Sequence, residues 1–201
     1  MVSSNLIKEL REKTGAGFLE CKKALDQCDG NLEKAEEVLR KKGMADAAKR
    51  QGRLASQGVV HSYIHSNSKI GVLLELNCET DFVAKTDEFN TLAHDIAMHV
   101  AALNPRYLSK GCVPAEDVEK EKEVFRVQAA NTGKPGPVVE KIVEGKLGKF
   151  YEEACLLQQP FIKQPEKSVE MLVKEVVAKL GENIEVRRFT RFQVGETVKA
   201  S

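Results

Sequence analysis

The pattern of apolar and polar residues changes its period in the middle of the chain. Over residues 70–78 the apolar side chains alternate, and one side of this alternation consists of Val72, Leu74, Leu76 and Cys78. From Phe89 onward the apolar residues recur every three or four positions, as they do on one face of a helix. The pattern therefore predicts a half-buried strand over 70–78 and a helix over 86–103, with Thr86 as its N-cap.

Phe82 lies at the junction of these two predicted elements, within the segment NCETDFVA at residues 77–84. It belongs to neither apolar face, so we expect its side chain to be exposed to solvent. An exposed aromatic residue on a rigid strand-to-helix turn, preceded by an acidic residue, is typical of an anchor that fills a pocket on a partner protein. The alternative is a hydrophobic staple that closes the start of the helix, and residue type alone does not separate the two.

Three short amphipathic helices are expected within residues 1–43. The first ends at Gly15, the second ends at Gly30, and Asn31 is placed to cap the third. Gly43 stands where a left-handed C-terminal cap is expected. Three helices of this size bury little surface, so the segment is better suited to recognising a partner than to folding alone.

A basic linker over residues 44–57, partly helical, is expected before an α+β core lobe over residues 58–201. The expected elements of this lobe are a strand over 59–65, a strand over 70–78, a helix over 86–103, a helical hairpin over 114–154 with its reversal at 133–137, a helix over 169–180 and a strand over 183–195. This order is not the regular alternation that builds a parallel sheet. We therefore expect a small antiparallel sheet covered by helices.

Two parts of the core lobe have a less regular pattern. In the last strand one phase of the alternation contains Ile184, Val186, Phe192 and Val194, with a bend or a strand edge expected where Arg188 and Thr190 interrupt it. The first arm of the helical hairpin has only a thin apolar line, which includes Phe125. This line indicates an arm that is packed on one side and exposed on the other.

The composition argues against several classes of partner and location. Lys and Arg number 31 against 30 Asp and Glu, so the formal charge of +1 provides no net field to hold a nucleic-acid backbone. The N-terminus has no basic segment followed by a long apolar run, and the longest apolar stretches have the length of strands. We expect a cytoplasmic protein without a membrane partner. The five cysteines show no C-x-x-C spacing, which indicates small core residues in a reducing compartment.

No catalytic or cofactor-binding constellation is recognisable. The four histidines, His61, His65, His94 and His99, are expected to be solvated or capping residues, not metal ligands. The segment Gly15-Ala16-Gly17 lacks the preceding strand and the following Lys-Ser/Thr of a phosphate-binding loop, so we expect no nucleotide to bind to this chain itself. We therefore expect no cofactor, no metal and no covalent chemistry, which means that the protein is not an enzyme in that sense.

Several segments resemble bacterial translation elongation factor Ts. They are TGAG at 14–17 with CKKAL at 21–25, NCETDFVA at 77–84, QPF at 159–161 and RFQVGE at 191–196. Two long motifs in the right order are more specific than one short pattern. The resemblance extends over nearly the whole chain, and it implies a guanine-nucleotide exchange factor that promotes GDP release from elongation factor Tu during translation.

The resemblance also assigns roles to individual residues. It implies an exchange wedge, inserted near the magnesium and phosphate site of elongation factor Tu, made of Thr80, Asp81, Phe82 and Val83. It implies docking residues in the N-terminal helices, which resemble a ubiquitin-associated domain, at Arg11, Phe18, Leu19 and Lys22. The family often has methionine at the positions of Phe18 and Leu19, so this chain departs from the pattern there.

Two further questions stay open at this point. A different class of function is a non-catalytic helical adapter that binds ubiquitin-like or other protein partners, although this alternative gives no role to Asp81 and Phe82. Longer members of the family carry two related core lobes, and a homodimer is the simplest way for this chain to recover the second lobe. We expect its surfaces at residues 184–194 and at the hairpin arm around Phe125. The alternative is that Arg187, Arg188 and Arg191 keep the strand edge solvated and the protein monomeric.

Overall fold

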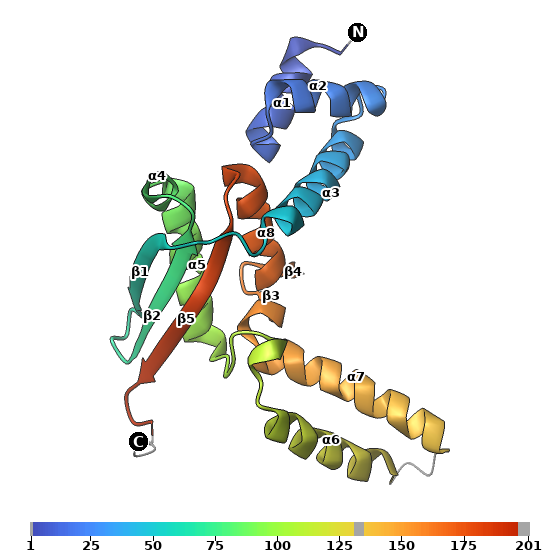
Figure 1. Ribbon diagram of the computed structural model, residues 1–201, viewed down its shortest axis with the longest axis vertical. Helices are drawn as coiled ribbons and strands as arrows, with labels where there is room; N and C mark the ends of the chain where they lie inside the picture. Colours follow the sequence, from blue (N-terminus) through green and yellow to red (C-terminus); the bar gives the residue numbers. More distant parts are fainter. Residues whose placement is uncertain (1, 131–134, 197–201) are drawn as a thin grey trace. The chain divides into compact units, whose positions relative to one another are not determined.

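The computed structural model describes residues 2–130 and 135–196, and its α+β fold confirms the predicted class (Figure 1). The N-terminal helices are α1 (Ser4–Thr14), α2 (Phe18–Gln27) and α3 (Leu32–Arg50). A sheet with the strand order β1-β2-β5 consists of β1 (Gln57–Ile64), β2 (Ile70–Cys78) and β5 (Ile184–Gln193). The other helices are α4 (Asp81–Ala84), α5 (Asp87–Leu103), α6 (Ala115–Ala130), α7 (Gly136–Ala154) and α8 (Val169–Leu180). Short elements are the 3-10 helices η1 (Lys110–Cys112) and η2 (Leu156–Gln158) and the antiparallel strands β3 (Pro160–Phe161) and β4 (Gln164–Ser168).

The chain divides into two compact units, each assembled from separate stretches of sequence. The first unit comprises Met1–Val60, Glu75–Ala93 and Met171–Arg187. The second unit comprises His61–Leu74, His94–Glu170 and Arg188–Ser201. The division by function into a docking module, a linker and a core lobe stays a prediction.

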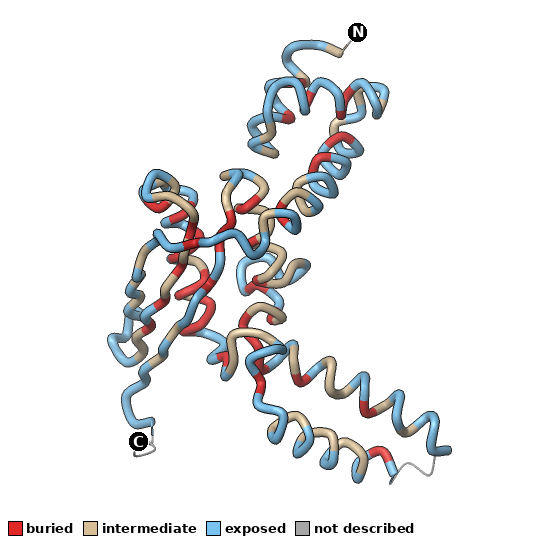
Figure 2. Tube along the Cα trace, in the orientation of Figure 1, coloured by how far each residue is buried: buried red, intermediate tan, exposed pale blue. Residues whose placement is uncertain are grey.

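Helices α1, α2 and α3 share a small apolar core in the first unit. Its buried members are Ile7, Leu10, Cys21, Ala24, Leu25, Ala35 and Leu39. Figure 2 shows buried positions interspersed with exposed ones along these helices, as expected of amphipathic helices. The predicted cap at Asn31 and the predicted helix end at Gly15 are confirmed, since Lys34 N donates to Asn31 Oδ1 at 2.9 Å and Gly15 follows α1 with φ of 69°.

The predicted end of the third helix at Gly43 is wrong, because α3 continues to Arg50. A Cβ atom at Gly43 would lie 2.9 Å from the Cβ of Ala178 in α8. The glycine therefore allows α3 and α8 to approach closely, so its role is packing and not capping. The next residues, which include Met44, Ala45, Ala47 and Ala48, are good helix formers and extend the helix into the predicted linker.

In the second unit, α6 and α7 form the predicted helical hairpin (Figure 1). The buried residues at its base are Val113, Phe150, Ala154 and Cys155, and the residues packed against them include Val118, Phe125 and Leu147. Val124 and Val127 of α6 are exposed, so α6 is packed on one side, as its thin apolar line indicates. The predicted reversal at residues 133–137 lies partly outside the described residues.

The expectation that all four histidines are solvated or capping residues is wrong for His99. Its buried ring lies on α5, where Nε2 donates to Gln159 Oε1 at 2.9 Å and Nδ1 accepts from Ile162 N at 3.2 Å. Burial lowers the pKa of His99 and outweighs the opposite effect of the bond to Gln159, so the neutral ring is favoured. The position three residues after Ile96 places His99 on the buried stripe of the helix, a signal that the sequence contained.

The structure also brings His61 of β1 and His94 of α5 together, with 3.3 Å between Nε2 and Nδ1. Burial and the proximity of His94 lower the pKa of His61. The Tyr63 hydroxyl of β1 lies 3.1 Å from Nδ1 of His65, the residue that follows β1. Among the described residues, no group of three or more His, Cys, Asp or Glu side chains could hold a metal ion.

The predicted alternation of the last strand is wrong for its second half. Ile184 and Val186 are buried, but Phe192 is 65% exposed. Arg191 turns inward instead, and its Nε donates to the carbonyl oxygen of Ala101 in α5 at 3.2 Å. The alternation therefore changes phase between Val186 and Arg191, which places Phe192 on the face of the sheet away from α5.

The cysteines follow the expectation in part. Cys21, Cys78 and Cys155 are buried, Cys28 is half-buried and Cys112 is exposed, and all five are free thiols. Within the ranges 2–130 and 135–196, no helix is long and apolar enough to cross a membrane.

Two glycine-to-alanine changes should have opposite effects on stability. At Gly58, with φ of 145°, a Cβ would lie 2.1 Å from the carbonyl oxygen of Leu76, whereas Gly145 in α7 has open space around it. We expect Gly58→Ala to lower the free energy of unfolding by about 2 kcal/mol or more, because backbone atoms must move. We expect Gly145→Ala to raise it by about 0.5–1 kcal/mol, because alanine restricts the unfolded chain and favours the helix. Urea unfolding followed by circular dichroism measures both, and a change of the same sign in the two variants would contradict this account.

Candidate functional site

The candidate site is the corner between β2 and α5, in the first unit, which contains the short helix α4. Thr80 precedes α4 in extended conformation, and its Oγ1 accepts from Val83 N at 3.4 Å. At the other end, the Thr86 hydroxyl donates to the carbonyl oxygen of Val83 at 2.8 Å and accepts from Phe89 N at 3.3 Å. Threonine is a favoured capping residue at both positions, so part of the support for this turn comes from its own neighbouring residues.

Phe82 is 79% exposed on this turn, which confirms the predicted exposure. Ala84 is buried and Val83 is half-buried, so the inner side of the turn is formed by those two residues. A residue acting as a hydrophobic staple would be covered by the helix that it closes. The staple alternative for Phe82 is therefore wrong.

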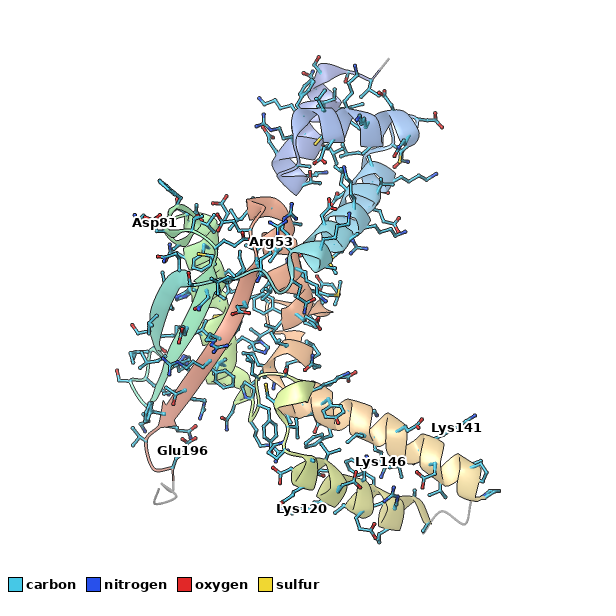
Figure 3. All side chains as sticks on the ribbon, in the orientation of Figure 1. Arg53, Asp81, Lys120, Lys141, Lys146 and Glu196 are labelled. Carbon is cyan, nitrogen blue, oxygen red and sulfur yellow. The ribbon has the colours of Figure 1, made fainter. Side chains whose placement is uncertain are left out.

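Asp81 lies next to Phe82 on the exposed side of the turn (Figure 3). Its carboxylate accepts from Lys85 Nζ at 2.7 Å. This hydrogen bond and the positive charge of Lys85 lower the pKa of Asp81, so the carboxylate is charged at neutral pH. An exposed ion pair of this kind is weak, and a partner can displace Lys85 from Asp81 at little cost.

The turn between α8 and β5 supports the corner through residues far away in sequence. The carboxylate of Glu182 accepts from Glu79 N at 3.1 Å, from Thr80 N at 3.0 Å and from the Thr80 hydroxyl at 2.6 Å. In return, Asn183 N donates to the Glu79 carboxylate at 2.7 Å. Sequence reasoning missed Glu182, because a contact between residues 102 positions apart leaves no local signal.

The segment before β1 joins the same network. Asn183 Nδ2 donates to the carbonyl oxygen of Arg53 at 2.8 Å, and Asn77 Nδ2 donates to that of Ala55 at 3.2 Å. The guanidinium of Arg53, labelled in Figure 3, lies 3.6 Å from the Glu79 carboxylate. The corner is therefore bonded to two other segments of the chain.

The residues expected to dock a partner lie on α1 and α2, outside this corner. Phe18 and Leu19 open α2 and are 52% and 69% exposed, and Lys22 is exposed one turn later. These three positions lie on one side of α2, while Cys21, Ala24 and Leu25 are buried in the helical core. Arg11 is exposed on α1. The structure thus presents the corner as four consecutive residues, and the docking set as three residues on one side of α2 with Arg11 on α1.

Comparison with known proteins assigns the chain to a family. Residues 45–196 match the family model described as Elongation factor TS. The elongation factor Ts of Carboxydothermus hydrogenoformans is 58% identical over 98% of this chain and 90% of its own length. That of Thermosipho melanesiensis is 58% identical over 98% of this chain and 100% of its own length. The chain belongs to the elongation factor Ts family. It is therefore a nucleotide exchange factor for elongation factor Tu, and the helical adapter is not favoured.

The elongation factor Ts relatives also cover the part that the family model leaves out. The model match begins at residue 45, beyond α1 and α2, whereas the relative from Acetivibrio thermocellus is 58% identical over 99% of this chain and 93% of its own length.

Proposed function

We propose that this elongation factor Ts promotes GDP release by inserting its corner of Thr80, Asp81, Phe82 and Val83 near the magnesium and phosphate site of elongation factor Tu. The observation that carries the proposal is Phe82, a large apolar side chain left exposed on a turn that is hydrogen-bonded at both ends. Exposed aromatic residues on a fixed backbone are typical interface anchors. The Asp81 carboxylate beside it would engage polar groups that otherwise support the magnesium ion.

The proposed mechanism is thermodynamic coupling, without covalent chemistry and without nucleotide bound to this chain. If the chain binds nucleotide-free elongation factor Tu more tightly than the GDP form, the affinity of elongation factor Tu for GDP is lower in the complex by the same factor. Each tenfold difference between these two affinities corresponds to roughly 1.4 kcal/mol of binding free energy. The contacts of Phe82 and Asp81 must therefore be stronger in the nucleotide-free state than in the GDP-bound state.

The proposed role of the N-terminal helices is docking. In this proposal residues 1–43 form the docking module, residues 44–57 connect it, and residues 58–201 form the core lobe that carries the corner. Arg11, Phe18, Leu19 and Lys22 would bind elongation factor Tu in either nucleotide state and raise the effective concentration of the corner at its target. Action on a translation factor places the proposed site of action in the cytoplasm, with neither nucleic acid nor a membrane as a direct partner.

We further propose a homodimer. In the second unit, Ile64, Leu73 and Phe192 are exposed on the face of the sheet away from α5, and β5 forms one edge of the sheet. The exposed Val124 and Val127 of the hairpin arm near Phe125 are a second apolar surface. Both surfaces would gain free energy from burial against a second copy of the chain.

Replacing Phe82 by alanine should slow exchange without unfolding the protein. Loss of a central interface anchor typically costs about 2 kcal/mol or more of binding free energy. We therefore expect the acceleration of GDP release by the variant to be at least about 30-fold smaller than that by the unmodified chain. The measurement is release of a fluorescent GDP analogue in stopped flow, with thermal unfolding measured in parallel. The matched control is Leu54→Ala, which removes an apolar side chain that is 82% exposed outside the corner. Normal exchange by a folded Phe82→Ala variant would contradict the wedge assignment.

The double variant Phe18→Ala with Leu19→Ala should separate docking from exchange. We expect the concentration of elongation factor Tu at half-maximal rate to rise at least about tenfold, because two interface side chains are lost. The maximal rate should stay within about twofold, since the corner is intact. Titration of the release rate against elongation factor Tu gives both values, with Val38→Ala of α3 as an exposed control. A fall in the maximal rate at unchanged half-saturation would refute the docking role.

The oligomeric state tests the homodimer. Light scattering at micromolar concentration should give about twice the chain mass of 22.3 kDa. Phe192→Asp should shift the mass toward that of the monomer, because a charge opposes burial of that face. Leu54→Asp adds the same charge outside that face and should leave the mass unchanged. A monomeric mass for the unmodified chain would exclude the dimer in this concentration range.

A further inference from the structure

We propose that Glu182 is a positioning residue for exchange, which holds the corner from the turn between α8 and β5. This inference rests on the proposed function of the corner. It concerns a residue that touches neither nucleotide nor magnesium in that proposal and acts through Thr80. The support is the set of hydrogen bonds that one carboxylate makes to two consecutive residues at the base of the corner.

The two oxygens of Glu182 divide these bonds between them. Oε2 accepts from the backbone N–H groups of Glu79 and Thr80, at 3.1 and 3.0 Å. Oε1 accepts from the hydroxyl of Thr80 at 2.6 Å. Hydrogen bonds to a charged carboxylate are stronger than those between neutral groups, so this arrangement fixes both the backbone and the side chain of Thr80.

The bond to Oε1 also sets the direction of the Thr80 hydroxyl. A hydroxyl has one proton to donate and two lone pairs to accept with. Because the proton is directed at Glu182, a lone pair is left for Val83 N, which donates to the same Oγ1 at 3.4 Å. Glu182 therefore orients the N-cap of the helical turn on which Phe82 lies.

The remaining polar group of Thr80 is engaged as well. Its carbonyl oxygen accepts from Ala84 N at 3.3 Å and from the Cys78 thiol at 3.1 Å. Burial raises the pKa of the Cys78 thiol, and the negative charge of Glu182 adds to this effect, so the thiol keeps the proton that it donates. Thr80 thus has its N–H, its hydroxyl and its carbonyl in hydrogen bonds within the corner and its support.

The proposed exchange wedge needs this support because its backbone must keep its conformation when it contacts the partner. Contact of Phe82 with a partner reorganises the partner only if the backbone beneath Phe82 keeps its conformation. A corner freed at Thr80 would instead adapt to the partner, or would lose conformational entropy when it binds. Glu182 should therefore affect the maximal exchange rate, while docking through α1 and α2 continues.

The first test compares three variants in the GDP-release assay with full-length chains. Glu182→Ala removes all three acceptor contacts, and we expect the maximal rate to fall about tenfold while half-saturation by elongation factor Tu stays within about twofold. Glu182→Gln should largely rescue the rate, because its carbonyl oxygen can accept from both N–H groups and its amide nitrogen can donate to the Thr80 hydroxyl. Glu185→Ala, which removes an exposed carboxylate on β5, should have no effect. Equal rates for Glu182→Ala and Glu185→Ala would overturn the proposal.

The second test is a double-mutant cycle between Glu182→Ala and Phe82→Ala. If Glu182 acts through the corner, Glu182→Ala should change the rate little further in the Phe82→Ala background. Full additivity would mean that Glu182 acts elsewhere and would overturn the proposal. If Glu182→Ala does not fold, as judged by circular dichroism, Glu182→Asp takes its place, since the loss of one methylene draws the carboxylate back from the three groups that Glu182 contacts.

The outcomes separate this inference from the proposed function. If Phe82→Ala leaves exchange unchanged, the wedge assignment itself fails. If Phe82→Ala slows exchange and Glu182→Ala does not, the wedge stands and only the positioning role of Glu182 is wrong.

Discussion

A helix of four residues cannot form by itself in water, and the corner that carries Phe82 depends on this constraint. Helix α4 spans Asp81–Ala84, which is too short to recover the cost of its own nucleation. Its conformation must come from groups outside it, and the carboxylate of Glu182 with the hydroxyls of Thr80 and Thr86 supply them. The candidate site is therefore a property of the folded unit and not of the segment at residues 77–84 alone.

The fold could be predicted from the sequence wherever the determining interaction is local. The caps at Asn31 and Thr86 and the exposure of Phe82 follow from residue types within one or two turns, and the structure has each of them. The segments of 70–78 and 86–103 were found by period alone, and β2 and α5 agree with them. Short-range hydrogen bonding and the alternation of apolar residues can both be inferred from the order of residues in the sequence.

The errors share a different physical origin, which is contact between distant parts of the chain. The residue type of Gly43 predicts a cap because glycine often ends helices, but its role in the structure is to allow close packing against Ala178 of α8. The expectation that His99 is a solvated or capping residue is wrong because its partners Gln159 and Ile162 lie 60 or more residues away and leave no local signal. In β5 the interruption at Arg188 and Thr190 predicts a bend or a strand edge, but the inward position of Arg191 depends on Ala101, which lies 90 residues away in sequence. The contacts of Glu182 are also to residues far away in sequence. The sequence therefore predicts the exposed residues of the site but not the residue that supports them.

Because the N–H, hydroxyl and carbonyl groups of Thr80 are all hydrogen-bonded within the protein, few groups of the corner remain available to contact another molecule. Thr80 is engaged internally, Ala84 is buried and Val83 is half-buried, so the exposed side chains of α4 are the Asp81 carboxylate, paired with Lys85, and the Phe82 ring. A small cyclic peptide that fixed a carboxylate and a phenyl ring on adjacent residues of one helical turn would reproduce most of this surface. Such a compound would carry the chemical features of the corner without the fold that holds them, which makes the corner a compact template for inhibitor design.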